Sequence, residues 1–204
     1  MNSNRRKFIK NSALATAAIG AMPMFMDACA SPGERIRVAL IGCRSMGFSN
    51  LSSFLAKDNN VDCVALCDVD SKILESRAAE VEKMTGNRPV IHSDFRKVLE
   101  DPGIDAVIIG TPDHWHAYMT ITALDAGKHV YVEKPMAHSI EECYEMVKAQ
   151  KKYPSLGVQV GMWQRSSKHW FEAADVVKSG KLGDVHLVKA WIYKGYDKPY
   201  PALE

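Results

Sequence analysis

Two glycines and an aspartate have the spacing of a site that holds a dinucleotide. Gly42 and Gly47 follow the apolar run Ile36–Ile41, and Asp68 follows a second apolar run at residues 61–66. In such an arrangement the pyrophosphate lies on free N–H groups at the start of a helix, and the acid accepts hydrogen bonds from the adenosine ribose. These residues predict a nicotinamide dinucleotide site that prefers NAD, because the charge of Asp68 repels the additional phosphate of NADP.

The loop between the glycines departs from the usual pattern at one position. That pattern has glycine at position 44, and this chain has arginine. A side chain there crowds the approach of the pyrophosphate to the backbone. Arg44 either swings out and pairs with a phosphate or remains a solvated surface residue, and the sequence leaves both interpretations open. We expect the whole loop to contact the cofactor, namely Gly42, Cys43, Arg44, Ser45, Met46 and Gly47.

A lysine stands directly after a later apolar run. Residues 130–132 lead into Glu133, Lys134 and Pro135. Ligands of open α/β sheets bind beyond the carboxyl ends of the strands, so Lys134 is a candidate general base. The alternative interpretation is a surface lysine. Glu133 either hydrogen-bonds a cofactor or sugar, or is a solvated carboxylate, and the sequence does not decide whether the Lys134–Pro135 bond is cis.

Further polar residues follow the strands predicted at 105–109 and 157–161. Thr111, Pro112, His114 and His116 are candidate cofactor contacts, although histidines at such a position are as often caps or packing residues. Gln164 and Arg165 are candidate substrate contacts, and a structural ion pair is an equal alternative for Arg165.

The segments that position these residues alternate between strand and helix. This alternation predicts an α/β fold, a Rossmann doubly wound parallel sheet with helices on both faces, over residues 35–160. Ser139 and Glu142 form a capping box at the start of one of its helices. Residues 161–204 read as the beginning of a second, α+β domain with a mostly antiparallel sheet, and contain a strand expected at Val185–Tyr193. We expect the chain to be an incomplete piece of a longer protein.

Composition narrows the class of protein. The 204 residues carry a formal charge of +2, but the first 29 residues hold four basic residues and one acid, which leaves the remainder at −1. No basic stripe remains for nucleic acid. Arg5 and Arg6 precede a short apolar stretch, which predicts a twin-arginine signal peptide over residues 1–29, a translocase partner and a periplasmic or outer-compartment location. Cys29 is a candidate lipid anchor. The five cysteines show no zinc spacing, and no metal site is expected.

Taken together, these motifs resemble the Gfo/Idh/MocA family of oxidoreductases. The resemblance covers residues 36–195 and rests on the Gly42–Gly47 loop, Asp68, residues 111–116 and, above all, residues 133–135. It implies a Rossmann domain followed by a sheet domain that holds the substrate. It also implies that Lys134 lies between nicotinamide and substrate, with Glu133 and Pro135 shaping that corner, and that further catalytic residues lie beyond residue 204.

The expected function is NAD-dependent hydride transfer involving a sugar or polyol, by a protein that is a homo-oligomer at full length. One alternative is an NAD-dependent glycosidase, because some relatives oxidise a sugar transiently, eliminate the aglycone and reduce the sugar again. The other is a nucleotide- or sugar-binding protein without turnover.

Overall fold

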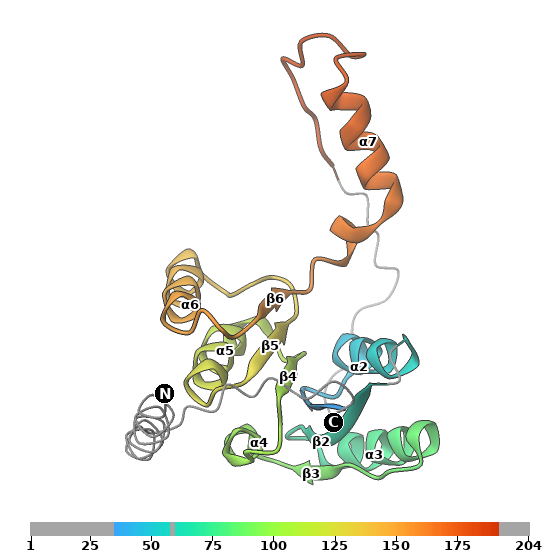
Figure 1. The fold of residues 1–204 in the computed structure, drawn as a ribbon, viewed down its shortest axis with the longest axis vertical. Coiled ribbons are helices and arrows are strands. Elements are labelled where there is room, and N and C mark those ends of the chain that lie inside the picture. Colours follow the sequence, from blue (N-terminus) through green and yellow to red (C-terminus); the bar gives the residue numbers. More distant parts are fainter. Residues whose placement is uncertain (1–34, 58–59, 192–204) are drawn as a thin grey trace, which may run out of the picture.

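The computed structural model describes residues 35–57 and 60–191 (Figure 1). Six strands form one parallel sheet in the order β3-β2-β1-β4-β5-β6. From β1 the chain builds outward through β2 and β3, and it then crosses to β4 on the other side of β1. The strand order therefore reverses between β1 and β4, which is where ligands of such sheets bind. The strands are β1 (Ile36–Ile41), β2 (Val61–Cys67), β3 (Val90–His92), β4 (Ala106–Ile109), β5 (His129–Val132) and β6 (Val158–Val160).

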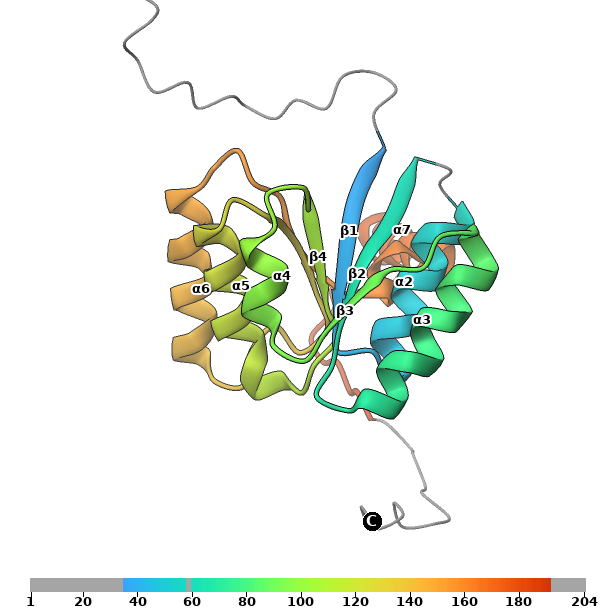
Figure 2. The same cartoon turned by 90° about the horizontal axis from the view of Figure 1, so that it is seen from below.

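Helices cover both faces of this sheet (Figure 2). On one face lie α2 (Ser45–Lys57) and α3 (Ser71–Thr85), and on the other lie α4 (Phe95–Glu100), α5 (His116–Asp125) and α6 (Ile140–Lys152). The doubly wound parallel sheet predicted from the sequence is confirmed.

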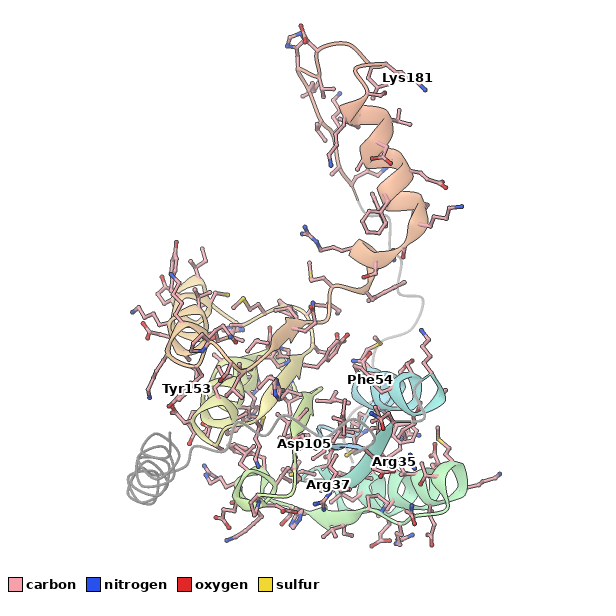
Figure 3. All side chains as sticks on the ribbon, viewed as in Figure 1. Arg35, Arg37, Phe54, Asp105, Tyr153 and Lys181 are labelled. Atoms are coloured by element: carbon pink, nitrogen blue, oxygen red, sulfur yellow. The ribbon has the colours of Figure 1, made fainter. Side chains whose placement is uncertain are left out.

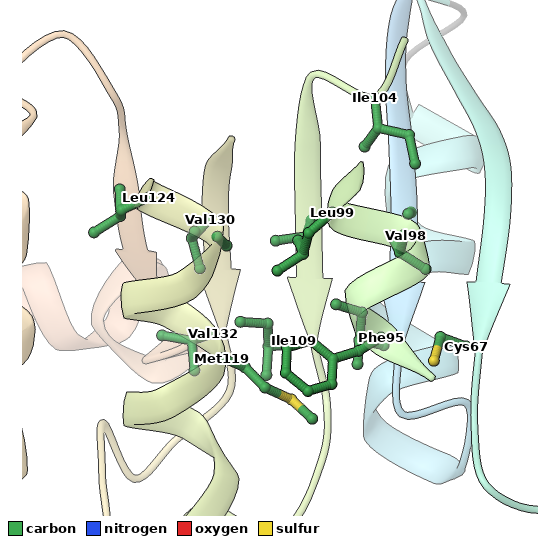
Figure 4. Packing of buried hydrophobic residues seen from close by; sticks show 14 of the residues in the cluster. Cys67, Phe95, Val98, Leu99, Ile104, Ile109, Met119, Leu124, Val130 and Val132 are labelled. Carbon is green, nitrogen blue, oxygen red and sulfur yellow. The ribbon is translucent and has the colours of Figure 1, made fainter. Parts of the chain in front are cut away.

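The sheet separates two apolar cores because neighbouring residues of a strand point to opposite faces. On β1, Val38 and Leu40 belong to the cluster formed with α2 and α3. Ile41 belongs to the second cluster, which includes Phe95 of α4 and Met119 of α5 (Figure 4). Both central strands are thus buried on both sides, as expected of parallel strands.

The amino ends of β1 and β4 are joined by Arg37 and Asp105 (Figure 3). The backbone N–H of Arg37 donates to the Asp105 carboxylate at 2.7 Å, and the N–H of Asp105 donates to the Arg37 carbonyl at 2.8 Å. The register that follows pairs Ile41 with Ile109. The residues after these two strands therefore emerge side by side at the carboxyl edge of the sheet.

Beyond β6 the chain forms η3 (Trp163–Ser166) and α7 (Lys168–Lys178), which stand apart from the sheet (Figure 1). The strand expected at Val185–Tyr193 is wrong for residues 185–191, which have no regular secondary structure. A strand needs a neighbour for its backbone N–H and C=O groups, and no described strand pairs with this segment. The second domain expected from residue 161 therefore contains no strand within residues 161–191.

In residues 35–57 and 60–191, no helix has both the length and the apolar character needed to cross a membrane. The predicted signal peptide and Cys29 lie outside the described residues.

Three helices begin at capping residues. Asp70 accepts from the N–H groups of Lys72 and Ile73 at the start of α3, and Asp94 caps α4. Ser139 and Glu142 form the predicted capping box at the start of α6, in which each side chain accepts from the other residue's backbone N–H. These bonds satisfy donors that a helix leaves without acceptors in its first turn.

We predict that Ser139→Ala lowers the free energy of unfolding by about 1 kcal/mol, the usual contribution of an N-cap side chain. Urea unfolding followed by circular dichroism measures the change. Ser53→Ala is the matched control, because the exposed Ser53 hydroxyl donates only to the Ser49 carbonyl within α2. Equal stabilities of the two variants would contradict a capping role for Ser139.

Candidate functional site

Three glycines bring the loop after β1 against the end of β4. A Cβ on Gly42 would lie 2.7 Å from the carbonyl carbon of Gly110, and one on Gly110 would lie 2.5 Å from the Cα of Gly47. Gly42 also has a φ of +89°, which other residues rarely adopt. The first turn of α2 therefore meets the β4 backbone directly. Gly110, which the sequence analysis did not select, is as necessary to this contact as the two glycines of the loop.

A cavity of about 660 Å³ opens beside this contact at the carboxyl edge of β1, β2, β3 and β4. Sites for small molecules and cofactors usually measure a few hundred to a thousand Å³. Of the predicted cofactor residues, Gly42, Arg44, Asp68, Thr111 and Pro112 line it. Additional lining residues that the sequence did not reveal are Val69, Ser93, Asp94, Phe95, Arg96, Gly110, Trp115 and Met119, together with Ile41 and Cys67.

Asp68 is held at the cavity by two backbone groups. One carboxylate oxygen accepts from the N–H of Cys43 at 2.8 Å, and the other accepts from the N–H of Asp70 at 3.0 Å. Each oxygen keeps a second lone pair, so the carboxylate is oriented and still able to accept from ribose hydroxyls. Asp68 lines the cavity, and its role as the acceptor for the ribose stays a prediction.

Cys43 supports Asp68 from inside the fold. Its side chain is fully buried, and its N–H is directed at the Asp68 carboxylate. Burial, with the nearby negative charge of Asp68, raises the pKa of the Cys43 thiol to about 12. The expectation that Cys43 contacts the cofactor is corrected accordingly, because Cys43 is fully buried and is not among the residues that line the cavity.

The start of α2 supplies the second half of the dinucleotide cradle. Ser45 and Met46 are exposed in its first turn, and Gly47 is packed against β4. N–H groups in a first turn lack acceptors within the helix, and the positive end of the helix dipole attracts anions. Such a turn is suited to bind the pyrophosphate of a dinucleotide.

Arg44 is exposed, as in the interpretation of a surface residue, but it is paired with an acid. Its guanidinium lies 2.6 Å from the carboxylate of Asp70, the residue that caps α3. Arg44 also lines the cavity, so the ion pair connects a cavity residue to the start of α3. Whether the guanidinium pairs with a cofactor phosphate stays a prediction.

A buried carboxylate lies directly before the candidate base. Glu133 is 5% exposed, and one oxygen accepts from the side-chain amide of Asn50 at 2.8 Å while the other accepts from the N–H of Lys134 at 3.2 Å. Gly161 leaves room for this carboxylate, since a Cβ there would lie 2.8 Å from it. Lys134 itself is exposed, and its bond to Pro135 is cis. The sequence carried no signal for Asn50.

His116 is a packing residue rather than a cofactor contact, which corrects the expectation from the sequence. The ring is 1% exposed and lies between two backbone carbonyls, with Nδ1 2.7 Å from Pro135 O and Nε2 2.9 Å from Thr111 O. A neutral ring carries one N–H and donates to one of the two carbonyls, whereas a protonated ring donates to both. Through these two contacts, His116 connects Thr111, which follows β4, to Pro135, which follows β5.

His114 is exposed beside an acid. Its Nδ1 lies 3.8 Å from the carboxylate of Asp113, and His138 approaches the same carboxylate at 3.4 Å. Hydrogen bonding from His138, and to a smaller degree the positive charge of the two histidines, lowers the pKa of Asp113 below its ordinary value. His114 is exposed, and its ring lies next to that of Trp115, which lines the cavity.

Gln164 and Arg165 lie in η3, outside the set of residues that line the cavity. The side-chain amide oxygen of Gln164 accepts from the indole N–H of Trp170 at 3.1 Å, which connects Gln164 to α7. Arg165 is exposed and forms no ion pair within residues 35–57 and 60–191. The structure does not bring either side chain to the cavity.

Residues 36–162 match the Gfo/Idh/MocA family, described as an oxidoreductase family with an NAD-binding Rossmann fold. The chain belongs to this family. The resemblance inferred from the motifs is thereby confirmed for the Rossmann domain.

Curated Gfo/Idh/MocA relatives include glycoside hydrolases. A glycosyl hydrolase family 109 protein of Shewanella baltica is 31% identical over 168 residues, which is 72% of this chain and 36% of the relative. An α-N-acetylgalactosaminidase of Shewanella oneidensis is 30% identical over the same share of each protein. The chain spans about a third of the length of these relatives.

Solved structures similar to this Gfo/Idh/MocA chain include dehydrogenases. The myo-inositol 2-dehydrogenase of Lactobacillus plantarum is 30% identical with a TM-score of 0.67, covering 74% of this chain and 43% of that one. The scyllo-inositol dehydrogenase of Lactobacillus casei, solved with NAD(H) and scyllo-inositol, is 27% identical with a TM-score of 0.66 over the same shares.

The donor set of this family member fits NAD. The cradle of Gly42, Gly47 and Gly110 admits a pyrophosphate, and Asp68 is oriented for the ribose. Residues of the cavity beyond Asp68, including Trp115 and Met119, offer apolar surface to flat rings.

We predict that Gly110→Ala abolishes most NAD binding and lowers stability by about 1–3 kcal/mol, the usual effect of forcing atoms into a packed site. Its Cβ would meet backbone atoms of Gly47 and Gly42, which have no side chain to move aside. Fluorescence titration with NADH and thermal unfolding measure the two effects.

Gly157→Ala is the matched control, because its Cβ would meet only the His129 side chain, at 3.3 Å. NADH affinity of the Gly110→Ala variant equal to that of this control would show that the glycine contact does not form the cradle.

Proposed function

We propose that this Gfo/Idh/MocA chain binds NAD and supplies the proton-transferring lysine of an enzyme that oxidises a carbinol of a sugar or cyclic polyol. The observation that supports it is the placement of Lys134, exposed at the carboxyl end of β5 directly after the buried, hydrogen-bonded Glu133. A structural neighbour that binds NAD(H) and scyllo-inositol supports the class of substrate.

When bound, NAD supplies the hydride acceptor. The cradle after β1 and the first turn of α2 hold the pyrophosphate, and Asp68 accepts hydrogen bonds from the ribose. The amine of Lys134 accepts the proton of the substrate hydroxyl and returns it in the reverse direction. Glu133 fixes the start of this segment through its bonds to Asn50 and to the N–H of Lys134.

Similarity to glycosyl hydrolase family 109 proteins favours a second candidate, a glycosidase that uses the same oxidation step. In that reaction the sugar is oxidised, loses its aglycone and is reduced again, so no NADH accumulates. The two functions share every residue assigned above. Incubation with free sugars and polyols, and separately with aryl N-acetylgalactosaminides, distinguishes them. Net formation of NADH supports the dehydrogenase, and release of the aryl group without NADH supports the glycosidase.

We predict that Lys134→Met lowers turnover by about 10²–10⁴-fold, the usual loss when a general acid–base group is removed. Methionine keeps much of the side-chain volume and lacks the amine. NADH affinity changes little, because the cradle and Asp68 lie at the other strands. Turnover by absorbance and NADH binding by fluorescence are measured on the same preparation.

The control is Lys181→Met, which removes an exposed lysine that follows α7 (Figure 3). Full turnover of the Lys134→Met variant would contradict the catalytic role. Loss of NADH binding together with turnover would assign Lys134 to holding the cofactor.

We also propose export by the twin-arginine translocase, which carries folded proteins and so delivers a protein that has already bound its nucleotide. The Arg5-Arg6 pair before a short apolar stretch supports this route. We predict that changing both arginines to lysine leaves the precursor in the cytoplasm, as measured by fractionation and immunoblotting. Delivery of the double variant at the normal level would contradict the proposal.

A further inference from the structure

Two aspartates and an arginine lie together beside the cavity. Arg44 lies 2.6 Å from one carboxylate oxygen of Asp70, and the backbone N–H of Asp70 donates to Asp68 at 3.0 Å. Arg44 and Asp68 both line the cavity. Asp70 therefore contacts both the guanidinium of Arg44 and the carboxylate of Asp68, which is the group oriented for the ribose.

The hold on Arg44 is built into the start of α3. The other oxygen of Asp70 accepts from the N–H groups of Lys72 and Ile73, so the carboxylate cannot turn away without uncapping the helix. The bond from Ile73, with further contributions that include the charge of Arg44, lowers the pKa of Asp70 below its ordinary value. Asp70 is thus charged at neutral pH and fixed with one oxygen directed at the guanidinium.

This arrangement matters for the group that distinguishes NADP from NAD. The additional phosphate of NADP is attached to the ribose hydroxyl that Asp68 is oriented to bind, and it requires a cation in that place. Arg44 is the cation of the loop, and guanidinium binds phosphate well. While Asp70 holds it, the arginine is occupied and its charge is balanced. Arg96, a second arginine of the cavity, is paired with Asp94 at 3.1 Å and lies over the ring of Phe95.

We propose that Asp70 is a specificity-determining residue that restrains Arg44, so that the chain prefers NAD although it carries an arginine suited to the NADP phosphate. The inference rests on the proposed binding of NAD. Asp68 excludes the phosphate by repulsion, and Asp70 withholds the cation that would compensate for it. Removing the charge of Asp70 then frees Arg44 for the phosphate.

Asp70→Asn tests this with little risk to the fold, because asparagine caps helices as well as aspartate does. The full chain is titrated with NADH and with NADPH, following energy transfer from tryptophan. We expect Asp70→Asn to strengthen NADPH binding by about tenfold, the strength of one hydrogen bond to a charged group, and to leave NADH binding within about twofold. In the double variant Arg44→Ala/Asp70→Asn the gain disappears.

Glu75→Gln is the matched control, since it removes an equal charge from α3. Glu75 pairs with Arg88, which follows that helix, and neither residue lines the cavity. A gain in NADPH binding that persists in the double variant would overturn the restraint of Arg44. The gain would then come from the loss of repulsion between the Asp70 carboxylate and the NADP phosphate, without any contribution from Arg44. Unchanged NADPH binding in Asp70→Asn, or an equal gain in Glu75→Gln, would overturn it as well. Failure of the unmutated chain to bind either nucleotide would instead overturn the proposed function, and the inference with it.

Discussion

The site depends on a contact between backbones that only glycine permits. Gly42, Gly47 and Gly110 pack so closely that a methyl group on any of them would overlap main-chain atoms of another. Because of this contact the first turn of α2 lies against the end of β4, at the point where the strand order reverses. This approach places the first turn of α2 beside the cavity at the ends of the strands. A looser contact would separate the pyrophosphate end of the site from the strands that carry its other groups.

The same helix also reaches the candidate base, which makes the two ends of the site one rigid unit. Asn50 lies on α2 and donates to Glu133 after β5, while His116 lies between the carbonyls of Thr111 and Pro135. Burying a carboxylate such as Glu133 is costly unless hydrogen bonds compensate, and here an amide and a backbone N–H do so. These polar groups fix the backbone on either side of Lys134 while the amine stays exposed. Glu133 thus positions the backbone, and the neighbouring Lys134 carries the candidate reactive amine.

The sequence was sufficient for features set by local pattern. Strand and helix periodicity predicted the parallel sheet, and the spacing of Ser139 and Glu142 predicted a cap that the structure confirms. Features that depend on a partner far along the chain were not predictable. The interaction of Asn50 with Glu133 joins residues 83 positions apart, and the burial of His116 depends on loops after two different strands. The strand expected at Val185–Tyr193 failed for a related reason, since alternation marks a segment suited to a sheet but does not supply the neighbouring strand.

Arg44 shows that a residue that departs from a motif can be accommodated when the backbone at that position does not require glycine. Glycine is required where φ is positive or where backbones touch, and within the described residues no residue other than glycine has a positive φ. Arg44 therefore occupies an ordinary conformation, and the close contacts fall on its glycine neighbours at positions 42 and 47. Its guanidinium is paired with Asp70, the residue that caps α3. The loop keeps its geometry for a dinucleotide, and the substitution adds a charge whose effect is decided by the residue that pairs with it.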